Sequence, residues 1–191
     1  MAMLDRLQWV GACLLGYGSQ GVRPDPGFVA LGHAVAPGLR LGCSLVEDQY
    51  RGTVEQPGII FNAESDPRGQ LQGHLLRAEP HQRSATLDAL AHRELNGRGY
   101  FPVITPVRCP ALPRGEGLAI VLVVNPRHPA VVNWSPRRKA RRIAAASGQA
   151  GSNLAYYRET RRWRQRAYGQ LDGVFAQIDA VLAQEGLLGG P

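Results

Sequence analysis

The sequence predicts a single α+β domain in which helices surround a compact, barrel-like mixed β-sheet. Short apolar or alternating segments separated by glycine and proline fill the first two thirds of the chain, which is the pattern of strands and turns. The remainder, from about residue 135, carries apolar residues at helical spacing. A length of 191 residues is typical of one domain, so we expect residues 1–191 to form one domain with helices at its C-terminal end.

Several short segments have the composition of strands. They are Val10–Leu15, Phe28–Ala36, Leu39–Val46, Gly58–Phe61, Leu71–Arg77, Tyr100–Val107 and Leu118–Val124. Pro37-Gly38 and the charged stretch SDPRG at residues 65–69 predict turns between neighbouring strands, because proline and glycine favour turn conformations. The segment 118–124 is continuously apolar, which predicts a central strand.

Helices are predicted at residues 84–95, from about 135 to 146, from about 152, and over the apolar stripe 171–182. Ser135 and Pro136 form a favourable helix start, because serine can cap the backbone N–H groups and proline fits the first turn. Gly186 is expected to end the last helix, since glycine readily adopts the conformation found there.

The composition is that of a soluble globular protein, with 44% hydrophobic and 19% charged residues. No run approaches the roughly 18 apolar residues that would cross a bilayer. The apolar stretch near the N-terminus is better explained by a buried strand than by a signal peptide. The cysteines, Cys13, Cys43 and Cys109, are too few and scattered for a disulfide framework or a zinc site. We therefore expect a cytoplasmic, reduced protein without a metal and away from membranes.

Positive charge is concentrated in the C-terminal third of a chain whose formal net charge is +7. One cluster comprises Arg137, Arg138, Lys139, Arg141 and Arg142, and another comprises Arg158, Arg161, Arg162, Arg164 and Arg166. Such clusters can follow a phosphate backbone, form solvated helix faces, or attract a small anionic substrate. Because no array of stacking aromatics and no recognition motif accompanies them, we expect solvated surface and no specific nucleic-acid partner. The oligomeric state is left open.

The segment RELNGRGY, residues 93–100, places a carboxylate beside an apolar surface. Glu94 follows Leu87 by seven residues and Leu90 by four, so a helix puts all three on one face. Loss of hydration there would raise the proton affinity of the carboxylate, as a general acid/base requires. The alternative is an ordinary last helical turn, in which Glu94 faces water and Gly97 caps the end.

Further motifs occur in order along the chain. They are GYGSQ at residues 16–20, YRGTVEQPGII at 50–60, VVNPRHP at 123–129 and ASGQAGSNLAYY at 146–157. Together with RELNGRGY, their order and spacing resemble the ChaC-like family of γ-glutamylcyclotransferases, glutathione-specific type, over roughly residues 14–157. Members of that family typically carry FGYGSL, DHRGTPEKPGR and GxSGxNxEYL at the corresponding places.

The resemblance implies the γ-glutamylcyclotransferase-like fold, a small mixed β-barrel with peripheral helices. It also implies an enzyme, a carbon–nitrogen lyase that releases 5-oxoproline from glutathione, leaving Cys-Gly, or from a related γ-glutamyl compound. In this reaction the α-amine of the substrate attacks the γ-carbonyl group of the same molecule, so the two reacting groups are already close together. No metal, nucleotide or redox cofactor is required.

The family's functional residues carry over to particular positions of this sequence. Glu94 matches the catalytic glutamate, and the family's γ-glutamyl-binding turn matches GYGSQ. Backbone N–H groups of that turn could hold an anion, while an arginine could pair with a substrate carboxylate. The implied substrate-binding residues are Tyr17, Gly18, Ser19, Gln20 and Arg51.

Some positions depart from the family pattern. Gln20 replaces the usual leucine, Tyr50 replaces the histidine before the arginine, and Leu76 and Leu122 stand where the family has tyrosines. Because two hydroxyl groups are lost, the sequence does not predict the acceptor side of the substrate, which is the group attached to the γ-glutamyl moiety. A function of another class also fits: a non-catalytic regulatory or binding protein on the same fold, which meets a partner through its basic surface. Retention of Glu94 favours the enzyme.

Overall fold

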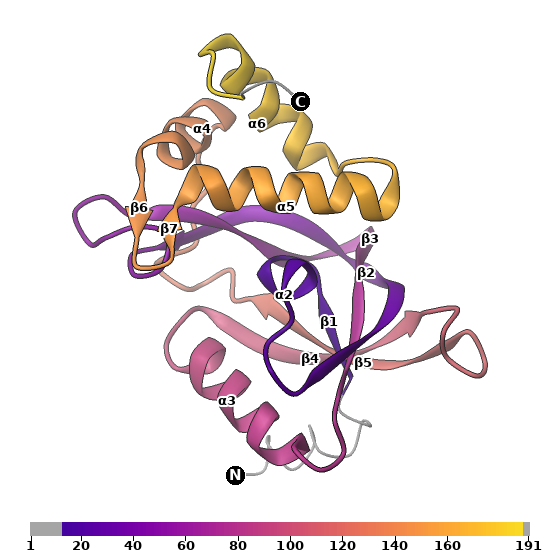
Figure 1. Cartoon of the computed structure of the whole chain (residues 1–191). Helices are drawn as coiled ribbons and strands as arrows, with labels where there is room; N and C mark the ends of the chain where they lie inside the picture. The colour runs from indigo at the N-terminus through magenta and orange to yellow at the C-terminus, as the bar shows by residue number, and fades with distance from the viewer. Residues whose placement is uncertain (1–12, 189–191) are drawn as a thin grey trace. The chain divides into compact units, whose positions relative to one another are not determined.

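Five β-strands close into a barrel in the computed structural model, which describes residues 13–188 (Figure 1). The strands are β1 (Cys13–Gly16), β2 (Phe28–Glu47), β3 (Gly58–Ala78), β4 (Tyr100–Arg108) and β5 (Glu116–Val124). Their order is β1-β3-β2-β4-β5, and β3 also pairs with β5. Since β1 is antiparallel to β3 and parallel to β5, the barrel is mixed, and the predicted fold class is confirmed.

The predicted helices are confirmed at nearly their predicted bounds. They are α3 (Arg83–Leu95), α4 (Pro136–Ala145), α5 (Asn153–Tyr168) and α6 (Gly173–Gln184). The short helix α2 (Ser19–Val22) and the two-residue strands β6 (Ser147–Gly148) and β7 (Gly151–Ser152) are not among the predicted elements. Ser135 caps α4 as predicted, because its side chain accepts a hydrogen bond from the backbone N–H of Arg138.

The predicted turns at Pro37-Gly38 and at residues 65–69 are wrong, because β2 and β3 run through them. Gly38 has a positive φ of 77°, but the strand continues past it. Gly69 lies so near the neighbouring strand that a Cβ there would be 2.5 Å from the carbonyl oxygen of Leu39. This glycine therefore allows two strands to approach closely and does not reverse the chain.

The chain divides into two compact units. Among the described residues, one unit comprises 13–40 and 63–125, and the other comprises 41–62 and 126–188. The strands β2 and β3 contribute residues to both. The prediction of a single domain over residues 1–191 stays a prediction, and the start of the first predicted strand, residues 10–12, lies outside the described residues.

The first unit contains an apolar cluster that fixes the orientation of α3. Leu87 and Leu90 of this helix are 4% and 5% exposed, which confirms the predicted apolar stripe. They pack against residues of β1, β3 and β5. The buried members of the cluster are Leu14, Leu76, Ala78, Leu87, Leu90, Ile120 and Leu122.

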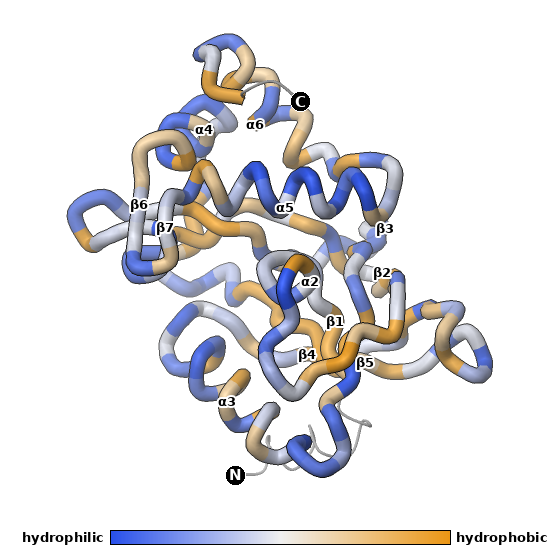
Figure 2. Tube along the Cα trace, viewed as in Figure 1, coloured by the Kyte–Doolittle hydropathy of each residue, from blue (hydrophilic) through white to orange (hydrophobic). Residues whose placement is uncertain are grey.

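Three aromatic rings form the centre of the second unit. The ring centroid of Phe61 lies 4.6 Å from that of Phe175 and 5.7 Å from that of Tyr157. These residues come from β3, α6 and α5, so both helices bury an apolar face in this unit. Figure 2 shows the complementary pattern, with hydrophilic residues along much of the length of α5.

The prediction that the second arginine cluster is solvated surface is wrong for part of it. Arg164 is fully buried, and its Nε donates a hydrogen bond to Oδ2 of Asp172 at 2.8 Å. Arg161 pairs with Asp179 at 2.7 Å. Because a buried cation needs a hydrogen-bonded anion, these side chains attach α5 to α6 and its N-terminal cap.

No helix within residues 13–188 is long and apolar enough to span a membrane. The cysteines Cys13, Cys43 and Cys109 are buried, and they form no disulfide within the part of the chain that the structure describes. Burial raises the pKa of the Cys13 thiol, partly offset by the positive charge of Arg77, so this thiol is a packing residue.

Candidate active site

The turn after β1 is built from a glycine-rich segment. Gly16 leaves no room for a side chain, because a Cβ there would lie 2.9 Å from the backbone of Gln20 and Gly21. The carbonyl oxygen of Gly18 accepts a hydrogen bond from the N–H of Gly21 at 3.0 Å, which begins α2. The backbone N–H groups of Ser19 and Gln20 have no acceptor in the described part of the chain. Two adjacent donors are therefore available to an anion.

Tyr17 fixes this turn to the barrel. Its side chain is only 8% exposed, and its hydroxyl donates a hydrogen bond to the carbonyl oxygen of Leu122 in β5 at 2.5 Å. Leu122 belongs to the apolar cluster that also holds Leu87 and Leu90 of α3. The predicted binding turn and the helix that carries Glu94 are thus attached to the same cluster.

Gln20 makes a two-point interaction with Asp25. Its Nε2 donates to Oδ2 of Asp25 at 2.6 Å, and its Oε1 accepts the backbone N–H of Asp25 at 3.1 Å. The other carboxylate oxygen of Asp25 accepts a hydrogen bond from Nη1 of Arg93 at 2.8 Å. A leucine at position 20 could form neither bond with Asp25, so the departure from the family pattern connects the turn to α3.

Glu94 lies in the last turn of α3, and its side chain is 20% exposed. Oε1 accepts a hydrogen bond from Nε of Arg93 at 2.8 Å, whereas Oε2 has no donor among the described residues. The carboxylate is therefore partly buried, held at one oxygen and open at the other.

Arg93 lies between two carboxylates. Its Nη1 is 2.7 Å from Oδ2 of Asp25, and its Nε is 2.8 Å from Oε1 of Glu94. Burial opposes the positive charge, but the hydrogen bonds and charges of the two carboxylates outweigh it and raise the pKa of Arg93. Gln20, Asp25, Arg93 and Glu94 therefore form one connected chain of side chains, which we call the Gln20–Glu94 network.

The loop after α3 is attached to the end of β5. Gly97 and Gly99 have φ angles of 76° and 81°, which favour glycine. The N–H of Asn125, the residue after β5, donates to the carbonyl oxygen of Gly99 at 2.7 Å. Tyr100 then pairs with Val124 in the antiparallel ladder. The motif RELNGRGY and the strand end VVN are thereby brought together.

Arg51 belongs to the second unit, where it contacts the motif at residues 146–157. Its Nη1 donates a hydrogen bond to the carbonyl oxygen of Ala150, and its guanidinium carbon lies 5.1 Å from the centre of the Tyr156 ring. Among the described residues the guanidinium has no ion-pair partner. It therefore retains donors for an anionic group, although its existing contacts also give it a structural role.

Close backbone contacts hold the segment around Arg51. A Cβ at Gly58 would lie 2.4 Å from the carbonyl oxygen of Arg51, and one at Gly148 would lie 2.6 Å from the backbone of Gly52. The carboxylate of Glu47 accepts the backbone N–H groups of Gln49, Tyr50 and Arg51. Glycine is thus required at two of these positions by close approach of the chain.

The leucines that replace the family's tyrosines are both in the apolar cluster of the first unit. Leu76 is fully buried and Leu122 is 8% exposed. Leu76 pairs with Leu14 between β3 and β1. Hydroxyls at these two positions are replaced by methyl groups, so the surroundings of α3 are more apolar than the family pattern implies.

The predicted site residues fall into two groups. Tyr17, Gly18, Ser19 and Gln20 lie in the first unit together with Glu94, whereas Arg51 lies in the second unit. Asp25 and Arg93 are not among the predicted site residues. Neighbours on a helix point about 100° apart, so the adjacency of Arg93 and Glu94 gave no reason to pair them. Asp25 stands in a loop, and no motif marks it.

Comparison with known proteins agrees with this fold. The family model described as ChaC-like protein matches residues 9–184, while comparison with curated proteins gives no match. The chain is similar to two crystal structures of a γ-glutamyl cyclotransferase specific to glutathione from yeast, one of them labelled with selenomethionine.

The labelled yeast structure has a TM-score of 0.76 and 18% identity, and the match covers 90% of this chain and 95% of that one. The second has a TM-score of 0.73 and 18% identity, with 91% and 98% covered. A further structure, of a γ-glutamyl cyclotransferase, has a TM-score of 0.51 and 13% identity, with 86% and 85% covered. At sequence identities of 13–18%, the structural similarity shows a shared fold and nothing more. Because the family match spans most of the sequence, the chain belongs to the ChaC-like protein family.

Proposed function

We propose that this chain is a γ-glutamylcyclotransferase that releases 5-oxoproline from glutathione, leaving Cys-Gly, or from a related γ-glutamyl compound. The observation that carries the proposal is the environment of Glu94: Arg93 holds one carboxylate oxygen, and the other is open. The Gln20–Glu94 network leads from that carboxylate to the turn that matches the family's substrate-binding turn. Membership of the ChaC-like family and the fold shared with the yeast enzyme support the same activity.

Glu94 performs both proton transfers of the proposed reaction. Its carboxylate takes a proton from the substrate's α-ammonium group, and the freed amine attacks the γ-carbonyl carbon to form a five-membered ring. The ring nitrogen of the tetrahedral intermediate loses its surplus proton to solvent. Collapse of the intermediate breaks the bond to the amide nitrogen, which receives the first proton back from Glu94, and the released amine takes up a further proton from solvent. Intramolecular attack provides an effective molarity on the order of 10⁵ M or more. The general acid/base contributes about 10²–10⁴-fold in rate.

The turn and Arg51 supply anion binding in this proposal. The free N–H groups of Ser19 and Gln20 bind the developing oxyanion or the substrate's α-carboxylate, because fixed backbone donors need little reorganisation. Tyr17 and Gly18 hold the turn in shape. Arg51 pairs with a substrate carboxylate through its remaining donors. Each step is assigned to these protein groups, and none involves a metal, nucleotide or redox cofactor.

Glutathione is the first substrate to test, and the apolar surroundings of α3 make the comparison with other γ-glutamyl compounds informative. Leu76 and Leu122 offer no hydroxyl to a polar acceptor group. The three buried cysteines are not joined by disulfides among the described residues, which supports a reducing location, the cytoplasm.

The test is to incubate the purified protein with glutathione, γ-glutamyl dipeptides and γ-glutamyl amines and to measure 5-oxoproline. We expect release from at least one compound, with loss of release in Glu94→Gln and retention in Asp88→Asn. Asp88 is a matched control because it is an exposed carboxylate on the same helix. If no compound yields 5-oxoproline, the alternative of a non-catalytic binding protein on this fold is favoured.

A further inference from the structure

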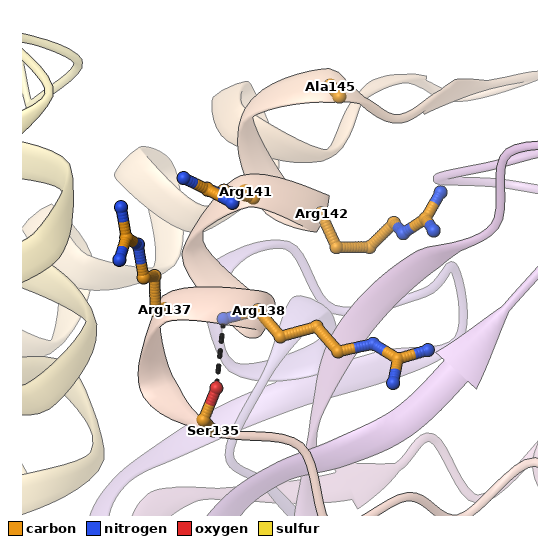
Figure 3. A pocket seen from close by; sticks show the side chains of 6 residues that line it. All are labelled: Ser135, Arg137, Arg138, Arg141, Arg142 and Ala145. Atoms are coloured by element: carbon orange, nitrogen blue, oxygen red, sulfur yellow. Dashed lines mark hydrogen bonds between the residues drawn. The ribbon is translucent and has the colours of Figure 1, made fainter.

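The solvent-facing side of α4 forms an arginine-lined groove. Ala140 and Ile143 of this helix are 0% and 1% exposed, so the opposite side of the helix faces solvent. A groove of about 530 Å³ follows that side (Figure 3). Its lining residues are Ser135, Arg137, Arg138, Arg141, Arg142 and Ala145. We call it the α4 groove.

The arginines form two rows along the α4 groove. Arg138 and Arg142 are four residues apart, as are Arg137 and Arg141, so each pair lies one helical turn apart. Figure 3 shows that the first pair extends to one side of α4 and the second pair to the other. Each row therefore places two guanidinium groups one turn apart on the same side of the helix, where they can bind one anion together.

Most of this charge is not neutralised within the described part of the protein. Arg141 lies 3.5 Å from a carboxylate oxygen of Glu185, but its side chain is still 60% exposed. Arg137, Arg138 and Arg142 have no ion-pair partner among residues 13–188. The first turn of α4 contains no acidic residue. The ordinary arrangement on a solvated helix, with carboxylates interspersed among the cations, is missing here.

Trp134 orients one of the two rows. The guanidinium carbon of Arg138 lies 4.1 Å from the centre of the Trp134 ring, and that of Arg142 lies 5.9 Å from it. Stacking on an aromatic face restricts a guanidinium group and leaves its N–H edge free for bidentate hydrogen bonds. The arrangement therefore lowers the entropic cost of fixing these arginines around a ligand.

We propose that the α4 groove binds a small molecule that carries two or more phosphoryl groups. A phosphoryl group offers several oxygens to the planar donor fork of arginine, and more than one negative charge is needed to balance the guanidinium groups of Arg138 and Arg142 beside Trp134. Single-stranded nucleic acid is a poorer fit, because such ligands stack bases on free aromatic faces. Here Arg138 covers a face of Trp134. This inference does not depend on the proposed cyclotransferase activity.

Titration calorimetry with inorganic tripolyphosphate at 0.15 M salt tests the proposal. At that ionic strength charges more than about 8 Å apart are largely screened, so a diffuse positive field contributes little. We expect saturable 1:1 binding that weakens at least about tenfold in R138Q/R142Q, because charge-assisted hydrogen bonds are lost. The matched control is R162Q/R166Q, which removes the same charge from an exposed pair at the same spacing on α5 and should change binding less than about twofold.

A second variant tests whether the orientation of the arginines, and not only their positive charge, contributes to binding. Trp134→Leu keeps every arginine but removes the aromatic face, so binding should weaken about two- to fivefold. Equal losses in R138Q/R142Q and R162Q/R166Q, or no saturable binding of tripolyphosphate, would overturn the proposal.

Other ligands distinguish the source of the phosphoryl groups. A nucleoside triphosphate that binds more tightly than tripolyphosphate would identify a nucleotide as the ligand, and equal binding would identify the phosphate chain alone as the recognised part. Tighter binding of a single-stranded oligonucleotide than of either compound, at the same salt concentration, would contradict a small-molecule site.

Discussion

Arg93 and Asp25 are 68 residues apart in the sequence, yet Nη1 of Arg93 lies 2.8 Å from Oδ1 of Asp25. The same guanidinium group also binds Glu94, and Asp25 also binds Gln20. One contact between a loop and a helix thus links the turn after β1 to the carboxylate that we propose as the general acid/base. The link depends on Gln20, a residue that departs from the family pattern.

Replacement of Glu94 by glutamine should lower 5-oxoproline release at least about a hundredfold, because the amide keeps the size of the side chain but cannot accept a proton. The melting temperature should change little. Turnover near the normal rate in Glu94→Gln, with Asp88→Asn as the control, would show that another group moves the proton.

Arg93 is expected to act as a positioning residue through Glu94. Arg93→Gln should lower kcat about tenfold or more, because it removes a charged hydrogen bond of about 1.5–3 kcal/mol. Arg93→Lys should restore part of the loss, since it retains the charge. The decisive measurement is a double-mutant cycle: in the Glu94→Gln background, Arg93→Gln should cause almost no further loss of kcat. An equal loss in both backgrounds would indicate a structural role alone.

Arg51 is expected to bind a substrate carboxylate. Arg51→Lys should raise KM about tenfold with a smaller effect on kcat, because an ammonium group cannot reproduce the planar donor fork. The exposed Arg68 provides a control through Arg68→Lys. An unchanged KM for every compound turned over would leave Arg51 with its structural contacts to Ala150 and Tyr156 only.

His74 should make stability depend on pH. Its ring stacks on that of His33 with centroids 5.0 Å apart, and burial, followed by the charge of His33, lowers the pKa of His74. The unfolded chain, with an ordinary histidine pKa of about 6.5, therefore binds the proton first as the pH falls. The free energy of unfolding should decrease from about pH 7 downward. His74→Gln should reduce this decrease when urea titrations are repeated at several pH values. An unchanged pH dependence in this variant would show that His74 is not its source.

Gly58 should be intolerant of a side chain. Gly58→Ala would place Cβ 2.4 Å from the carbonyl oxygen of Arg51, so we expect a loss of about 1–3 kcal/mol in the free energy of unfolding. Gly173→Ala at the start of α6 meets nothing within 4 Å and should be neutral or stabilising. Similar stabilities of the two variants would show that the chain near Arg51 can relax.

Local sequence patterns predict most of the helices and strands. Where these predictions are wrong, the pattern describes one position and not its neighbours in space. The spacing of Leu87 and Leu90 predicted α3 and its buried face, and Ser135 predicted the start of α4. Pro37-Gly38 predicts a turn, but β2 continues through it. Proline and glycine indicate the backbone conformation that is favoured at one position. They do not indicate whether pairing with a neighbouring strand keeps the chain extended there.

Periodicity and motif order depend on neighbours along the chain, so they are enough to predict the fold class, the helix that carries Glu94 and the turn after β1. They do not show that Asp25 and Arg93 join that turn to Glu94, or that Arg164 is a buried ion-pair partner while Arg138 faces solvent. These outcomes depend on which segments pack together. All arginines look alike in a sequence, and packing alone decides which of them lose water and gain a carboxylate.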